Sequence, residues 1–360
     1  MRLGDYLSLA CSVSLASSFT ARGAVRCQLA RRCVIIAVLV GALLPGDLVT
    51  AGESALSSPT LFDGAADGSA AVDVGDGYFV GATDEENTLR LYAAKGGVPS
   101  KPLAVDIEAA VKKALGVDKI KECDLEGAAT IGELTFWIGS HGRNSDAKEK
   151  RERQVLFATK LTGKGKDAQL EMADKVYTKL LDDLKAHPPL AAFNLGKAAT
   201  LAPKDKAALN IESIAADGDK LWIGFRNPQV NEDQALLVPL LNPAEVIKGD
   251  GRARLGEPVF LPLGELGVRD MTKWKDGFLI IAGDFRDRFE AGIQPSRIFF
   301  WKPGSAPKDI GVNLGDLNPE AILTMGEGDQ ARILILSDDG KYPERQGKTF
   351  RGVWLNVTGI

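Results

Sequence analysis

The chain has 360 residues, of which 45% are hydrophobic and 26% are charged; this composition excludes an intrinsically disordered protein and supplies enough apolar material for a sizeable core. Its formal net charge of −4 provides no excess of basic residues of the kind that nucleic acid attracts, so no nucleic-acid partner is expected.

Residues 1–51 carry the pattern of a secretory signal peptide. They contain five arginines, no lysine and two aspartates, and an apolar run from Cys33 to Leu44 follows two consecutive arginines. Small residues end the segment at Ala51, after which cleavage is expected. The run is too short for a transmembrane span, which needs about 20 apolar residues. The sequence therefore predicts an exported protein, periplasmic or extracellular, with 52–360 as a single domain and no transmembrane segment in the mature chain.

Cleavage at that point would leave Cys123 as the only cysteine, because the other three lie in residues 1–51. An intramolecular disulfide and a cysteine-based zinc site are therefore excluded for the mature chain.

Five segments of the mature chain share one plan, and this repeat determines the expected fold. They are residues 67–87, 124–144, 210–227, 268–287 and 318–340. Each has a short strand of small and apolar residues, a turn rich in Gly and Asp, and a second strand rich in aromatic and β-branched residues. Further strands follow each hairpin, as in the four-stranded blade of a propeller. The sequence predicts an all-β fold, a five-bladed β-propeller; a six-bladed ring, with a blade hidden in 185–209, is the alternative.

Two departures from the repeat are expected. The long interval before the third copy contains Asp167 to Lys185, whose apolar positions recur at helical spacing and predict a helical insertion near 167–187. The last copy supplies a third strand at Thr349 to Val357 but no fourth. The segment from Ser57 to Phe62 can fill that place, so an N-terminal strand is expected to close the ring.

The polar residues at the starts of the five copies should surround one mouth of the channel. A hairpin brings its second strand back to the end where the first began, and residues i and i+2 of a strand point the same way. Two tiers of side chains follow from this spacing. The outer tier is Asp67, Asp124, Asn210 and Asn318, and the inner tier is Ser69, Glu126, Glu212, Asp270 and Glu320.

Three ways of neutralising the inner carboxylates remain open. Arginines can pair with them in purely structural ion pairs. A hard cation such as Ca²⁺ takes six to eight oxygen ligands, and its predicted ligands here are Glu126, Glu212, Asp270 and Glu320. An anionic or sugar-like ligand can instead be bound by arginine forks. The predicted ligand-binding residues are Arg143, Asn144, Arg226, Asn227, Arg269, Asp284, Asp338 and Asp339.

Complete catalytic motifs are missing from the sequence. There is no Gly-x-Ser-x-Gly elbow, no Walker-type phosphate loop and no His-x-x-x-His metal pair. His141, one of only two histidines, directly follows a buried strand. Because histidine ordinarily titrates near neutrality, His141 is the candidate general base or proton shuttle if the mouth is catalytic. A histidine fixed by hydrogen bonds beside a loop is the alternative.

Five strings in the chain carry a family resemblance: LEGAA at 125–129, WIGSHGRN at 137–144, GFRNP at 224–228, LLVPLLNPAEV at 236–246 and ILSDDG at 335–340. They resemble a family of exported bacterial proteins of β-propeller type known only as a domain of unknown function, over roughly Phe62 to Gly340. More loosely, the hairpins are similar to those of phytase-type esterase-like propellers and of the gluconolactonase and regucalcin group. In that group an acid at the start of an inner strand helps hold a divalent cation. Glu126, Glu212 and Glu320 match this position.

Two functions from different classes follow. The first is a binding or scaffold propeller in the cell envelope, with an unknown small molecule or envelope protein as its partner. The alternative is a Ca²⁺-dependent hydrolase of the lactonase or phosphoesterase type, which the carboxylates and His141 motivate. The lack of a complete catalytic motif favours the binding protein.

Overall fold

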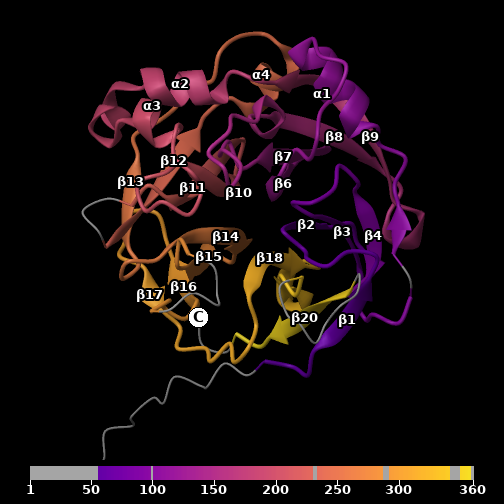
Figure 1. Ribbon diagram of the computed structural model, residues 1–360. Helices are drawn as coiled ribbons and strands as arrows, with labels where there is room; N and C mark the ends of the chain where they lie inside the picture. The colour runs from indigo at the N-terminus through magenta and orange to yellow at the C-terminus, as the bar shows by residue number, and fades with distance from the viewer. Residues whose placement is uncertain (1–55, 99, 230–232, 287–291, 341–348, 358–360) are drawn as a thin grey trace, which may run out of the picture. The chain divides into compact units, whose positions relative to one another are not determined.

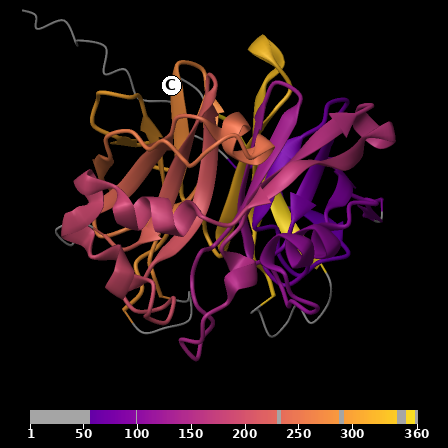
Figure 2. The same cartoon turned by 90° about the horizontal axis from the view of Figure 1, so that it is seen from above.

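The computed structural model describes residues 56–98, 100–229, 233–286, 292–340 and 349–357. They form five antiparallel sheets of four strands each, arranged around a centre as a five-bladed β-propeller (Figure 1), which confirms the predicted fold class. Figure 2 shows the strands running between the two faces of the propeller, with the connecting loops gathered at those faces. The predicted signal peptide and its cleavage site lie outside the described residues.

Each blade runs outward from an inner strand, and four blades are continuous in sequence. Blade one is β2 (Ala70–Asp73), β3 (Tyr78–Ala82), β4 (Arg90–Ala93) and β5 (Lys101–Pro102). Blade two is β6 (Leu125–Ile131), β7 (Leu134–Gly139), β8 (Leu156–Thr162) and β9 (Gln169–Tyr177). Blade three is β10 (Asn210–Asp217), β11 (Lys220–Asn227), β12 (Gln234–Leu240) and β13 (Val259–Pro262). Blade four is β14 (Gly267–Trp274), β15 (Gly277–Gly283), β16 (Arg297–Trp301) and β17 (Lys308–Asp309).

Blade five joins the two ends of the ring. It consists of β18 (Pro319–Met325), β19 (Arg332–Ser337), β20 (Thr349–Leu355) and, as its outer strand, β1 (Thr60–Asp63). β1 pairs antiparallel with β20, with Phe62 opposite Phe350. The predicted closure by an N-terminal strand is therefore confirmed. The inner strands β2, β6, β10, β14 and β18 contact one another in this order around the centre.

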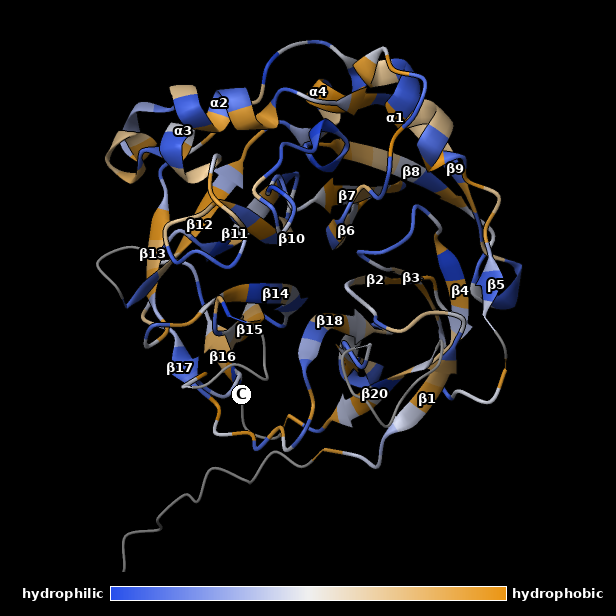
Figure 3. Ribbon diagram, in the orientation of Figure 1, coloured by the Kyte–Doolittle hydropathy of each residue, from blue (hydrophilic) through white to orange (hydrophobic). Residues whose placement is uncertain are grey.

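Apolar side chains fill the spaces between neighbouring blades. Five clusters of buried residues each pack two consecutive blades together, from blades one and two around to blades five and one. Figure 3 shows apolar colour concentrated on the strands and hydrophilic colour on many of the connecting loops. Because each blade contributes to two clusters, the ring depends on every blade, and the inner strands are held at fixed positions around the channel.

The predicted helical insertion is shorter than expected. Residues Gln169–Tyr177 form β9, and only Leu180–Ala186 form a helix, α2. A register shift between Leu156 and Ala158 of β8 breaks the two-residue alternation of β9, and this irregularity produced the helix-like spacing of its apolar residues. The rest of the interval holds a 3₁₀ helix, η3 (Pro188–Phe193), and α3 (Leu195–Ala198), so the blade considered at 185–209 for a six-bladed ring is not formed.

The other helical segments lie in connections between strands. They are α1 (Ile107–Leu115), α4 (Pro243–Lys248) and the single turns η1 (Arg151–Arg153), η2 (Gly165–Asp167) and η4 (Gly328–Gln330). Within the described ranges, every helix is too short or too polar to cross a bilayer.

Candidate functional site

Four of the five inner strands contain a β-bulge at the end where the polar residues were expected. In β6, Leu125 faces Gly139 and Gly127 faces Ile138, which leaves Glu126 as the extra residue. A bulge re-aims the side chain of its extra residue and is common beside functional sites. The equivalent extra residues of β10, β14 and β18 are Glu212, Arg269 and Glu320. All four line one cavity at the mouth of the channel.

Blade four corrects the predicted inner tier by one residue, because Arg269 and not Asp270 occupies the bulge. Asp270 faces Ile281 in the regular ladder, and its buried carboxylate accepts hydrogen bonds from Ser213 Oγ at 3.2 Å and from the Ile322 backbone N–H at 2.8 Å. Burial raises the pKa of Asp270 well above its ordinary value. Asp270 therefore connects the inner strands of blades three, four and five and is not among the residues that line the cavity.

The same shift explains why blade four has no polar residue in the outer tier. The tier position falls on Gly267, where a Cβ atom would collide with the backbone carbonyl of Arg226.

In three other blades the two tiers are in contact. The hydrogen bonds are Ser69 Oγ to Asp67 at 2.8 Å, Asn210 Nδ2 to Glu212 at 2.7 Å and Asn318 Nδ2 to Glu320 at 3.4 Å.

The cavity has a volume of about 490 Å³, and residues of all five blades line it. Its acidic lining residues are Asp67, Asp84, Glu122, Asp124, Glu126, Glu212, Asp284, Glu320 and Asp338. Its basic lining residues are Lys121, Lys150, Arg153, Lys204, Arg226, Arg269 and Arg286. This volume falls within the range of small-molecule sites, and a lining so rich in charge selects a polar ligand.

On the wall formed by blades three to five, arginines neutralise the carboxylates. Glu212, only 3% exposed, pairs with Arg226 at 2.9 Å and with Arg269 at 3.2 Å. Arg269 also pairs with Glu320 across the gap between blades four and five. For these two glutamates the structure matches the purely structural alternative, in which arginines join the blades by ion pairs.

On the wall formed by blades one and two, three carboxylates converge. Asp84, Asp124 and Glu126 each offer an oxygen within 4.8 Å of the other two, which is compatible with a shared metal ion. Burial, and then the charges of Asp124, Glu212 and Asp84, raise the pKa of Glu126 well above its ordinary value. Within the described part of the chain, Glu126 has neither a hydrogen bond nor an ion pair to its carboxylate, whereas Asp124 pairs with Arg153 at 2.8 Å.

Asp67 extends this acidic wall. Burial and the nearby charge of Asp84 raise the pKa of Asp67 well above its ordinary value, with smaller contributions from Asp338 and Glu85. The mouth is therefore divided by charge. Carboxylates dominate on blades one and two, and guanidinium groups dominate on blades three and four.

Most of the predicted ligand-binding residues line the cavity: Asn144, Arg226, Arg269, Asp284 and Asp338. Arg143 and Asn227 instead hold the connection between blades two and three. Arg143 Nε donates to the Ala199 carbonyl at 2.7 Å, and Asn227 Nδ2 donates to the carbonyls of Pro203 and Asp205 at 3.0 and 2.7 Å. The held segment brings Ala202, Pro203 and Lys204 to the cavity. These two residues thus position a loop of the site.

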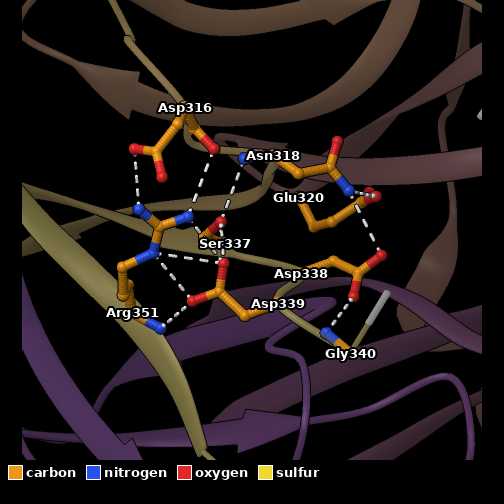
Figure 4. A network of polar contacts seen from close by, with 8 residues as sticks. All are labelled: Asp316, Asn318, Glu320, Ser337, Asp338, Asp339, Gly340 and Arg351. Atoms are coloured by element: carbon orange, nitrogen blue, oxygen red, sulfur yellow. Dashed lines mark hydrogen bonds and ion pairs between the residues drawn. The ribbon is translucent and has the colours of Figure 1, made fainter. Parts of the chain in front are cut away.

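Asp339 is not among the residues that line the cavity and belongs to a polar network of blade five (Figure 4). Its carboxylate, 1% exposed, accepts hydrogen bonds from Arg351 Nε at 2.9 Å and Nη2 at 2.8 Å and from Ser337 Oγ at 3.0 Å. Arg351 Nη1 also pairs with Asp316 at 2.8 Å. Asp338, the next residue along the chain, lines the cavity and accepts from Asn318 Nδ2 at 3.2 Å. The network fastens β20 to the loop that presents Asp338.

His141 is buried and is not part of the cavity lining. It is 1% exposed, its Nδ1–H donates to the Gly139 carbonyl at 2.8 Å, and its Nε2 has no partner among the described residues. Burial lowers the pKa of His141 to about 4. The imidazole is therefore neutral at neutral pH. It lies buried just after β7 of blade two, outside the cavity lining.

This burial predicts a pH-dependent contribution to stability. The pKa of His141 is lower in the folded chain than in the unfolded chain, so protonation favours unfolding. The stability that the neutral, buried imidazole contributes is therefore complete above about pH 6.5, its ordinary pKa. That stability is lost as the pH falls towards 4. The stability difference between the wild type and His141→Gln should narrow by about 3 kcal/mol between pH 7 and pH 4. Urea unfolding at several pH values measures it. His187→Gln, which changes the other histidine, is the control, and a constant difference for His141→Gln would contradict the prediction.

Asp84 of the acidic wall and Arg153, which pairs with Asp124 of that wall, were not among the predicted site residues. Asp84 follows β3, where Thr83 Oγ1 accepts the backbone N–H groups of Glu85 and Glu86 and so shapes the loop. Arg153 comes from η1, just before β8, and pairs with both Glu122 and Asp124. Asp84 had a sequence signal, since it is the polar residue after a second strand. Arg153 had none, because its approach depends on the path of a long connection.

The search of the curated proteins found no match to this chain. Solved structures with a similar arrangement include the glutaminyl cyclase of Myxococcus xanthus, at 12% identity and a TM-score of 0.41, covering 84% of this chain and 96% of that one. The major Malassezia sympodialis allergen Mala s 1 is similar at 9% identity and a TM-score of 0.47, covering 84% and 97%. A putative oxidoreductase (glucose dehydrogenase) of Thermus thermophilus is similar at 11% identity and a TM-score of 0.39, covering 84% and 100%.

A family model matches residues 148–346, which is more than half of the chain and includes blades three and four and the two outer strands of blade two, β8 and β9. The match agrees with the resemblance carried by the strings GFRNP, LLVPLLNPAEV and ILSDDG. The chain belongs to the family described as "Protein of unknown function (DUF3616)".

Proposed function

We propose that this chain is an exported binding protein whose channel mouth holds a divalent cation, with Ca²⁺ as the first candidate, between Asp84, Asp124 and Glu126. The observation that carries the proposal is the convergence of three carboxylate oxygens within 4.8 Å in a ligand-sized cavity. Export rests on the pattern of residues 1–51, and an intact-mass measurement of the protein recovered outside the cytoplasm tests it.

Electrostatics support a cation at this wall. Three partly desolvated carboxylates repel one another, and they are stabilised by a cation, by shared protons or by water. Arginine already serves this purpose at Glu212 and Glu320, but Glu126 has no such partner in the described chain. Carboxylate oxygens are the ligands that Ca²⁺ prefers, and water can complete its coordination. The proposed ligands therefore differ from those expected from the sequence, sharing only Glu126.

We place binding ahead of a Ca²⁺-dependent lactonase or phosphoesterase. Such an enzyme would use the cation to activate water and would benefit from a nearby base. His141, the candidate base, lies outside the cavity lining, and burial lowers its pKa to about 4, which makes it a weak base at neutral pH. The hydrolase therefore remains the second candidate, to be tested with lactone and phosphoester substrates in the presence of Ca²⁺.

Calorimetric titration of the chelated protein with Ca²⁺ tests the proposal. The wild type should bind Ca²⁺ and unfold at a higher temperature when Ca²⁺ is present, because a ligand that binds only the folded state stabilises it. Glu126→Gln should bind Ca²⁺ at least about tenfold more weakly, since it removes one charged ligand. Without metal the same variant should be as stable as the wild type or more so, because one repulsive charge is gone.

The matched control is Glu133→Gln, which changes an exposed glutamate that pairs with Lys160 at the turn between β6 and β7. It should leave Ca²⁺ binding unchanged. If the wild type neither binds Ca²⁺ nor gains thermal stability at millimolar metal, the cation proposal is wrong.

A further inference from the structure

Two arginines meet at the part of the cavity that blades three and four line. Arg226 stands near the end of β11 and Arg269 in the bulge of β14, and both line the cavity. Each contacts a different oxygen of Glu212, Arg226 through Nη1 and Arg269 through Nε. One buried carboxylate thus holds two guanidinium groups side by side at the mouth.

The described contacts leave several of their donors unused. A guanidinium has five N–H donors spread over three nitrogens. Within the described ranges, Arg226 uses only Nη1, and its Nε is buried without a partner. Arg269 uses Nε and Nη2, the latter towards Glu320. Arg226 Nε and Nη2 and Arg269 Nη1 therefore remain without a protein acceptor among the described residues, at a wall of the cavity.

The two guanidinium groups also repel each other at this wall. Arg269 is 8% exposed, and burial and the neighbouring positive charge of Arg226 lower its pKa against the opposing effect of Glu212. A second anion near both groups would reduce their mutual repulsion and supply the missing acceptors. Two further basic residues, Lys204 and Arg286, line the same cavity, and Arg286 pairs there with Asp284 at 2.6 Å.

We infer that Arg226 and Arg269 form a subsite for an oxyanion, a phosphate or a carboxylate, carried by a small ligand. Planar guanidinium groups bind both anions with paired hydrogen bonds. The inference deepens the proposed function, because the ligand would extend from this subsite towards the cation held by Asp84, Asp124 and Glu126. The cavity of about 490 Å³ admits a small organic acid or phosphoester of this kind.

Three compounds with one carbon skeleton test the inference by calorimetry: glycerol 3-phosphate, glycerate and uncharged glycerol. The Ca²⁺-loaded wild type should bind at least one of the two oxyanions and should not bind glycerol. Arg226→Met should bind that oxyanion at least about tenfold more weakly. Arg226→Lys, which keeps the charge beside Glu212 but loses the fork, should show the same weakening and guards against misfolding of the first variant. The control Arg332→Met removes an exposed arginine of β19 outside the cavity lining and should leave oxyanion binding unchanged.

The failures of the two proposals are distinguishable. If the wild type binds Ca²⁺ but neither oxyanion, or if Arg226→Lys binds the oxyanion as tightly as the wild type, the subsite is refuted while the cation site stands. If the wild type binds no Ca²⁺, the titrations are repeated in chelator. If the wild type binds an oxyanion in chelator and Arg226→Lys does not, the subsite is supported without the cation. If the wild type binds no oxyanion in chelator, the subsite is refuted together with the cation site.

Discussion

Replacing Glu212 by glutamine is expected to lower the free energy of unfolding by about 3 to 5 kcal/mol, because it leaves buried guanidinium charge without its partner. Glu212 forms ion pairs with Arg226 and Arg269 and accepts a hydrogen bond from Asn210 Nδ2, so one substitution disturbs contacts from blades three and four. The loss should be the same in chelator and in Ca²⁺, since arginines rather than a cation neutralise this residue. Denaturant unfolding of wild type and variant under both conditions measures it.

The contrast with Glu126→Gln makes this result diagnostic. Both variants remove one carboxylate charge at equivalent bulge positions, yet only Glu212 has arginine partners in the described chain. Glu126→Gln should change Ca²⁺ binding with little effect on the metal-free fold, and Glu212→Gln should do the reverse. A stability loss for Glu212→Gln that appears only with Ca²⁺ would show that the cation lies at the arginine wall instead.

Removal of the chain before Gly64 is expected to have the largest effect on the fold. It deletes β1 and leaves β20 as an open edge, which promotes aggregation. It also removes Phe62, whose ring contacts those of Phe79, Tyr92 and Phe350 at centroid distances of 5.3, 5.9 and 5.3 Å. Loss of a buried phenylalanine alone costs about 3 to 5 kcal/mol. The truncated protein should therefore unfold at a lower temperature and aggregate, as thermal melts and light scattering would show.

A peptide of residues Leu56–Asp63 provides the specific control. If closure is a strand pairing, the free peptide should bind the truncated protein by adding a strand to β20 and should raise its melting temperature. The same peptide with Phe62→Asp should not, because the aromatic cluster cannot accommodate the charge. A truncated protein that melts like the wild type would contradict the closure.

The fold was predictable because its information is local and repeated. Each blade begins with a hairpin whose turn residues and strand residues differ sharply in type, so five copies could be recognised one by one. The closure was also predictable, since the last copy lacked a strand and the segment before the first copy supplied one. The extent of the helical insertion was not, because a strand with an irregular register shows the same apolar spacing as a helix.

The location of the polar mouth could be predicted from the sequence, but the contacts that its residues make could not. The polar residues at the starts of the hairpins indicated where the charged cavity lies, and Glu126, Glu212 and Glu320 line that cavity. The assignment of Asp270 failed because a bulge shifts the ladder by one residue, and such a shift changes which neighbour faces the channel. Arg153 reaches Asp124 from a connection between strands, and the residue types along the chain do not encode that approach.

The closing strand has a consequence for the order of folding. β1 and β20 pair residues from opposite ends of the propeller, whereas blades one to four are built from strands adjacent in sequence. Closing the longest loop costs the most chain entropy, so this pairing should form after the local blades. Arg351, on β20, fastens the loop that carries Asp338 to the mouth. The side of the mouth that blade five contributes is thus completed last, and occupancy of the cavity reports a finished ring rather than any single folded blade.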